Sequence, residues 1–179
     1  MAQLRLNLLM IVATIVLFSA MLVVNELLFL PLEFAPGINW IYLPAGMRLL
    51  CPLMFGGAGA LGLLIVSALV NYLHFFPQDG LRSFMGAILS SAAPYLVYLA
   101  ARHRYGLQAS LANLTPRRLL FCALGCSLAN PLLLHLWFLI HGDQVDLVRG
   151  FAVMAAGDLA GTLIVVYTAK ALVSLVPRP

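Results

Sequence analysis

Hydrophobic positions in this chain gather into long runs, and short polar or turn-forming stretches separate one run from the next. A helix needs about 20 mostly apolar residues to cross the hydrocarbon core of a bilayer. The runs that approach this length are residues 7–30, 38–55, 58–74, 81–101, 119–140 and 150–170. We therefore predict an all-α integral membrane protein, a six-helix bundle in which residues 1–179 form a single transmembrane domain.

The second run, residues 38–55, differs from the others because prolines interrupt it. Pro44 and Pro52 lie inside it, with Gly46 between them. Proline lacks a backbone N–H donor and disfavours helical geometry in the residue before it. We expect residues 40–43 to be extended and a short helix to begin at Pro44, so that this second helix is broken and proline-punctuated. Broken backbone at membrane depth is tolerated only where protein or a water-filled cavity covers it.

The composition supports lipid as the solvent of this chain. Hydrophobic residues make up 63% of the sequence and charged residues only 9%, whereas a soluble domain has about 25% charged residues. A soluble protein with so few polar side chains could not cover its surface. The net charge of +4 therefore concerns orientation in the lipid bilayer, and we predict no nucleic-acid partner.

Charged residues sort by side when the runs are threaded through a bilayer. With both termini cytoplasmic, one basic set lies inside: Arg5, Arg102, Arg104, Arg117, Arg118, Lys170 and Arg178. The loop acids fall outside, together with two basic exceptions: Glu33, Asp79, Asp143, Asp146, Arg82 and Arg149. Positive charge favours the cytoplasmic side. We therefore predict a multi-pass protein of a bacterial-type inner membrane, with the N and C termini in the cytoplasm.

Two charged residues lie deep inside hydrophobic runs. Asp158 is the only acid or base within residues 150–169, and Arg48 lies in the middle of the interrupted second run. A charge at the bilayer centre costs about 2.5–3.5 kcal/mol on insertion scales, so each needs a partner, a proton or water. Gly157 and Gly161 belong to a small-residue ridge beside Asp158, so this side of the helix should face protein.

Other polar residues share this depth. Counted at about 1.5 Å per residue, they fall within about 17 Å of the outer face, in the outer half of a core about 30 Å thick. We interpret them as lining a polar pocket that opens outward. The candidate ligand-binding residues are Arg48, Asp158, Asn130, His135, Glu26, Asn71 and Trp40. Three interpretations stay open: an Arg48–Asp158 bridge that only locks the bundle, a lock combined with a ligand site, and a proton relay.

Enzyme, metal and cofactor motifs are missing from the sequence. It contains no H-E-x-x-H, no G-x-S-x-G and no C-x-x-C. The glycine-rich corner at residues 56–62 lacks the lysine of a phosphate-binding loop, and the three cysteines suit small apolar packing. His135 and Asp158 could act as acid and base, but a lone histidine on an apolar helix is more often a core residue. We therefore predict no enzymatic activity, no cofactor and no metal.

Two short motifs resemble a known family. Trp40-x-x-x-Pro-Ala-Gly46 is similar to the opening motif of MASE-type membrane-associated sensor domains of the first class. Gly157-Asp158-x-x-Gly161-x-Leu163 resembles the closing helix of the same family. The resemblance implies a membrane module that senses a small signal and passes it to kinase, cyclase or phosphodiesterase domains. No such domain follows within this sequence, so we expect a protein partner in the membrane to receive the signal.

The predicted size and number of spans also resemble the substrate-binding subunits of energy-coupling-factor vitamin transporters. The leading hypothesis is a sensory or small-ligand-binding module with an outward-facing polar pocket, acting through a partner protein. The alternative is the substrate-binding subunit of a solute transporter. A copurifying ATPase or an uptake defect would favour the alternative, and a neighbouring signalling protein would favour the sensor.

Overall fold

A computed structural model of the chain describes residues 1–107, 114–142 and 146–175, with side chains described as far as residue 172. Within this part the chain folds into six α-helices, which confirms the prediction of an all-helical protein with six helices. They are α1 (Ala2–Phe29), α2 (Pro44–Phe55), α3 (Gly57–Val70), α4 (Gly80–Tyr105), α5 (Pro116–His141) and α6 (Leu147–Leu175). A π-helical turn, Asn71–Phe75, continues α3.

Five of the helices in the described residues are long and apolar enough to cross a membrane, which indicates a multi-pass membrane protein. The spans are Ala2–Leu32, Gly57–Phe75, Gly80–Tyr105, Pro116–His141 and Leu147–Leu172. The exception is α2, whose 12 residues reach about 18 Å against a hydrocarbon core of about 30 Å. The second predicted run therefore supplies a short helix with a non-helical entry. Pro44 stands in the first turn of α2, where a missing N–H costs nothing.

Between α1 and α2 the chain makes a small excursion that the sequence did not predict. A 3-10 turn, Leu30–Leu32, leads into two short antiparallel strands, β1 (Glu33–Ala35) and β2 (Ile38–Asn39). Gly37 has a φ of 79° in the turn between them, a backbone conformation that glycine adopts without the steric penalty of a side chain.

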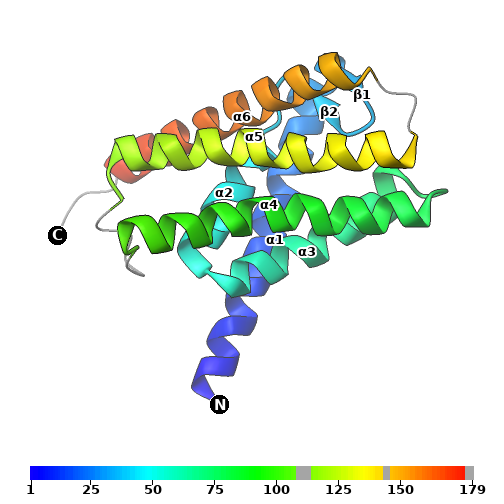
Figure 1. Cartoon of the computed structure of the whole chain (residues 1–179). Helices are drawn as coiled ribbons and strands as arrows, with labels where there is room; N and C mark the ends of the chain where they lie inside the picture. Colours follow the sequence, from blue (N-terminus) through cyan, green and yellow to red (C-terminus); the bar gives the residue numbers. More distant parts are fainter. Residues whose placement is uncertain (108–113, 143–145, 176–179) are drawn as a thin grey trace.

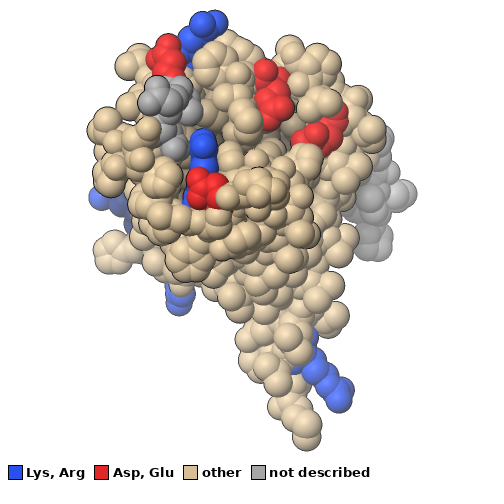
Figure 2. Space-filling view, turned by 90° about the vertical axis from the view of Figure 1, so that its right-hand side faces the viewer, with Lys and Arg blue, Asp and Glu red and all other residues tan. Residues whose placement is uncertain are grey.

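The molecule has two ends with different charge. The end at the right of Figure 1 gathers the C-terminal ends of α3 and α5 and the N-terminal ends of α4 and α6. The described acids other than the buried Asp158 gather on this face (Figure 2), and they are Glu26, Glu33, Asp79 and Asp146. The opposite end carries Arg102, Arg104, Arg117, Arg118 and Lys170. We call these the acidic end and the basic end.

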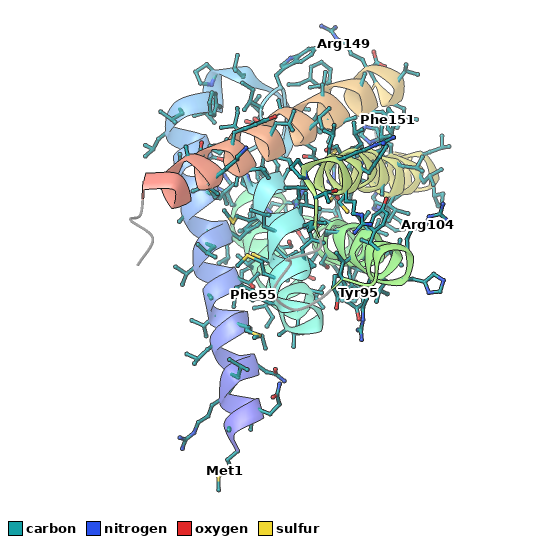
Figure 3. All side chains as sticks on the ribbon, turned by 90° about the vertical axis from the view of Figure 1, so that its left-hand side faces the viewer. Met1, Phe55, Tyr95, Arg104, Arg149 and Phe151 are labelled. Carbon is teal, nitrogen blue, oxygen red and sulfur yellow. The ribbon has the colours of Figure 1, made fainter. Side chains whose placement is uncertain are left out.

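Helices α4 and α5 run side by side, α6 lies over them at an angle, and α1 runs across the group (Figures 1 and 3). The middle of α1 packs on α3, where Phe18 joins Leu63 and Val66 in a buried cluster. The N-terminal half of α1 projects from the bundle, and its apolar side chains, such as Leu4 and Leu9, are exposed. A helix that is apolar on all sides suits lipid rather than water.

The chain before α2 lies directly on the glycine ridge of α6. A Cβ atom added to Gly157 would collide with the carbonyl oxygen of Asn39, and one added to Gly161 with that of Tyr42. Only glycine permits so close an approach between a helix and a neighbouring backbone. The glycines that bracket Asp158 thus form the surface on which the second segment rests.

Two hydrogen bonds satisfy the backbone of this non-helical segment. The Tyr42 N–H donates to the carbonyl oxygen of Gly157 at 3.1 Å, and the Leu43 N–H donates to Oδ1 of Asn25 at 2.8 Å. These donors would otherwise lack partners in an apolar environment, at a cost of several kcal/mol each. Asn25 in α1 and the glycine ridge in α6 therefore hold the segment in place from two sides.

Candidate functional site

A small cavity of about 50 Å³ lies at the acidic end, lined by the turn and start of the strand pair β1–β2 (the strand ribbon) and by residues of the neighbouring helices. Its polar lining residues are Tyr42, Arg48, Asn71, Arg82 and Ser90. No acidic side chain of the described residues belongs to the lining. A volume measured in this way must reach about 10–15 Å³ to hold one water. The cavity therefore has room for a few waters or for one small chemical group.

Arg48 is the buried charge of this cavity, with 8% of its surface exposed. Its guanidinium carbon lies 5.1 Å from the centre of the Tyr42 ring and 5.6 Å from that of Phe18. Ring faces at such distances attract a cation by about 0.5–2 kcal/mol. Among the described residues, Nε and Nη1 of Arg48 have no hydrogen-bond partner. The ring contacts thus compensate only part of the cost of burying this charge.

The direct hydrogen-bond partner of Asp158 is Asn130, and not Arg48. Nδ2 of Asn130 donates to Oδ2 of Asp158 at 2.8 Å, and both side chains are buried between α5 and α6. No ion pair within 4.0 Å joins Arg48 and Asp158 in the part of the chain that the structure describes. The two charges still lie close enough to act on each other electrostatically. The structure therefore brings Asn130 and Asp158 into contact and leaves Arg48 facing the cavity.

His135 lies outside the cavity lining and is held within the bundle. Its Nδ1 donates to the carbonyl oxygen of Pro131 at 2.8 Å. Its ring packs edge-on against Phe138 and Phe151, with centroid distances of 5.2 and 5.9 Å. A carbonyl oxygen can only accept, so Nδ1 carries the proton. Nε2 is buried and has no hydrogen-bond partner among the described residues.

The remaining predicted site residues take three different positions. Asn71 lines the cavity, and its Nδ2 donates to the carbonyl oxygen of Ser83 at 3.1 Å, which ties the turn after α3 to α4. Glu26 lies outside the lining, with its Oε1 3.5 Å from Nε2 of the exposed His74. Trp40 is also outside the lining, and 48% of its surface is exposed, which suits an aromatic residue at a membrane interface.

Three polar lining residues were missing from the predicted set: Tyr42, Arg82 and Ser90. The only signal for Arg82 was its charge, because it is a basic residue among the acids of its side. Its guanidinium carbon lies 4.3 Å from the centre of the Phe76 ring and 5.2 Å from that of Phe138. Ser90 carries no such signal, since a serine in a small-residue stretch predicts close helix packing equally well.

Neither a metal centre nor a reactive thiol is apparent in this region. The described residues contain no group of three or more His, Cys, Asp and Glu side chains that could hold a metal ion. Cys51, Cys122 and Cys126 are free and buried. The chemistry available at the cavity is therefore hydrogen bonding and electrostatic attraction by arginine.

Comparison with known proteins gives no further assignment. No family model matches the chain, and neither the curated proteins nor the solved structures include a significant match.

Proposed function

We propose that this chain is a multi-pass protein of a bacterial-type inner membrane, with both termini cytoplasmic and the acidic end outside. The helix ends support this orientation. Gln3 and Asn7 of α1 line a hollow together with Arg102 of α4, and Lys170 of α6 lines another with Arg117 of α5. The first turns of α1 and the last turns of α6 thus each lie beside an arginine of the basic end, which the preference of basic residues for the cytoplasm puts inside.

Successive membrane crossings must alternate in direction between the acidic and the basic end, and the segment that contains α2 supplies one of these crossings. Tyr42, just before it, lines the cavity at the acidic end, and Phe55, its last residue, lines the hollow that contains Arg102. The non-helical entry and α2 together carry the chain from one end to the other. This segment therefore counts as a crossing, although α2 alone is too short to be one.

The function that this site supports best is recognition of a small polar ligand from outside. The observation that carries it is Arg48, a buried cation that borders a cavity and has donors without partners in the described structure. A bundle that used Arg48 only as a lock would pair it with an acid, because an uncompensated buried charge costs several kcal/mol. A ligand or ordered waters in the cavity would supply the missing partners.

Ligand binding in the cavity can affect the cytoplasmic side of the protein through the contact between α2 and α6. Arg48 belongs to α2, and Gly46 in the same helix contacts the side chain of Val165 in α6. A ligand that moves Arg48 therefore presses on α6, which runs to the basic end. This path and the resemblance to membrane-associated sensor domains favour a sensory module that acts on a partner protein in the membrane.

Cavity size favours sensing over vitamin transport. Pockets for drug-sized ligands measure about 300–1,000 Å³, whereas this cavity measures about 50 Å³. A vitamin-sized solute would require the helices to separate.

Labelling with a membrane-impermeant thiol reagent in intact cells tests the orientation. Gln78→Cys lies in the turn before α4 at the acidic end and should react from outside. His103→Cys lies near the end of α4 at the basic end and should react only after permeabilisation. The native cysteines are buried, so their background should be low. Reaction of His103→Cys in intact cells would reverse the orientation and with it the proposed access to the cavity.

Thermal unfolding of the purified protein with libraries of amino acids, small acids and vitamins tests the ligand site. A ligand at a hundredfold excess over its dissociation constant stabilises the folded form by about 2.7 kcal/mol. The effect should be lost in Ser90→Val, where added methyl groups fill the cavity. It should persist in the matched control Ser127→Val, at a buried serine outside the lining. A ligand site at this cavity would be contradicted if no compound stabilised the protein. It would also be contradicted if a stabilising compound acted equally on Ser90→Val and Ser127→Val.

A further inference from the structure

Two arginines from different helices line the same small cavity. Arg48 comes from α2 and Arg82 from the first turn of α4, and no acid of the described residues shares the lining with them. Building on the ligand site proposed above, we propose that the cavity binds a small free monoanion.

The guanidinium groups suit this role because of how they are held. Each has its carbon within 4.3–5.6 Å of the centres of two aromatic rings: Phe18 and Tyr42 for Arg48, Phe76 and Phe138 for Arg82. Ring contacts fix a guanidinium, and its N–H donors lie in its own plane, where a carboxylate can accept them in pairs. For Arg48, which is buried, two nitrogens have no hydrogen-bond partner in the described structure.

The other polar groups of the lining are largely committed elsewhere. Asn71 donates to the carbonyl oxygen of Ser83 at 3.1 Å, and Ser90 donates to that of Ala87 at 3.4 Å. Recognition therefore depends on the arginines, and a ligand with no negative charge would leave Nε and Nη1 of the buried Arg48 without an anionic partner among the described residues. Positive potential with no opposing acid among the described lining residues selects an anion at short range.

Cavity size and the surrounding charge limit the ligand further. Room for a few waters admits an ion such as formate, acetate or chloride. The acids around this end, such as Glu33 and Asp79, repel anions from the approach, but salt screens exposed charges beyond about 8 Å. A single negative charge meets less of this repulsion than a double charge does, so a monoanion is favoured.

The test is thermal unfolding of the full chain in uncharged detergent at constant ionic strength. The large anion gluconate is replaced stepwise by formate, acetate or chloride, and the unfolding midpoint is followed. The midpoint should rise and saturate with at least one of the small anions. Arg48→Gln should abolish the rise. Arg82→Gln should increase the half-saturating concentration about tenfold, as expected for loss of one charge-assisted hydrogen bond.

Arg149→Gln is the matched control. Arg149 is exposed at the acidic end and outside the lining, so its loss should leave the saturation curve unchanged. Should Arg48→Gln fail to fold, Arg82→Gln decides the question, and an unchanged half-saturating concentration there would overturn the proposal.

Formamide and acetamide separate this inference from the ligand site itself. They match formate and acetate in size but carry no charge, and they should have no saturable effect. If they stabilise the protein as strongly as the anions and with the same dependence on Arg48 or Arg82, the anion assignment fails and the polar ligand site stands. If no probe, charged or neutral, shows such a dependence, the anion assignment fails, and the library screen with Ser90→Val decides the ligand site.

Discussion

Asn130→Leu should lower the free energy of unfolding by about 1.5–3 kcal/mol, the range measured for hydrogen bonds to charged groups. Its Nδ2 donates to Oδ2 of Asp158 at 2.8 Å, and both side chains are buried. Asp158→Leu should cost a similar amount, because it strands the amide in turn. The double variant should recover part of the loss, since replacing both partners by apolar groups leaves no orphaned polar group. Unfolding of the four proteins in a denaturing detergent gives the coupling energy.

Two further measurements serve as controls for this double-mutant cycle of Asn130 and Asp158. Asn7→Leu, at an exposed asparagine in α1, should change stability by less than about 0.5 kcal/mol. A second cycle between Arg48→Leu and Asp158→Leu should give a smaller coupling energy, because no direct ion pair joins these residues in the described structure. Additive losses for Asn130 and Asp158 would show that the hydrogen bond contributes nothing.

Gly161→Ala should destabilise the protein by about 1–3 kcal/mol, the usual cost of overpacking. The added Cβ would collide with the carbonyl oxygen of Tyr42, and a backbone atom cannot move aside as a flexible side chain can. The segment before α2 would have to lift from α6, and the hydrogen bond from Tyr42 N–H to Gly157 would weaken. The same unfolding measurement checks this.

The matched control is Gly125→Ala in α5. A Cβ at Gly125 would lie 3.8 Å from the Val97 side chain, an ordinary contact distance. Alanine is also a better helix former than glycine by about 1 kcal/mol. Gly125→Ala should therefore be neutral or stabilising. Equal losses at the two glycines would mean that the contact of α6 with the second segment is not tight.

Helix positions were predictable because lipid imposes a simple rule on sequence. Each long apolar run became a helix, and the helix of the interrupted run begins at Pro44, where proline is favoured. Helix ends were less predictable, since the polar residues that extend α4 to Tyr105 and α5 back to Pro116 can project into headgroups or water. The strand ribbon had no signal, because its strands are too short for an alternating pattern.

The depth of the buried charges in the membrane could be predicted from the sequence, but the residues that contact them were harder to predict. Sequence places Arg48 and Asp158 at similar depth, but contact also depends on how each helix is rotated and tilted. In the structure α5 presents Asn130 to Asp158, while Arg48 turns toward the rings of Phe18 and Tyr42. Neutral residues such as Asn130 compete as partners in an apolar interior, and opposite charge alone does not reveal them.

A density map of the purified protein would show directly whether Arg48 serves a ligand cavity. We expect non-protein density in the cavity, within hydrogen-bonding distance of the Arg48 guanidinium, with Asn130 still bound to Asp158. A map in which Arg48 pairs directly with Asp158 and side chains fill the space between Arg48 and Arg82 would contradict it. In that case Arg48 would be part of a structural lock, and the proposed ligand site would not exist.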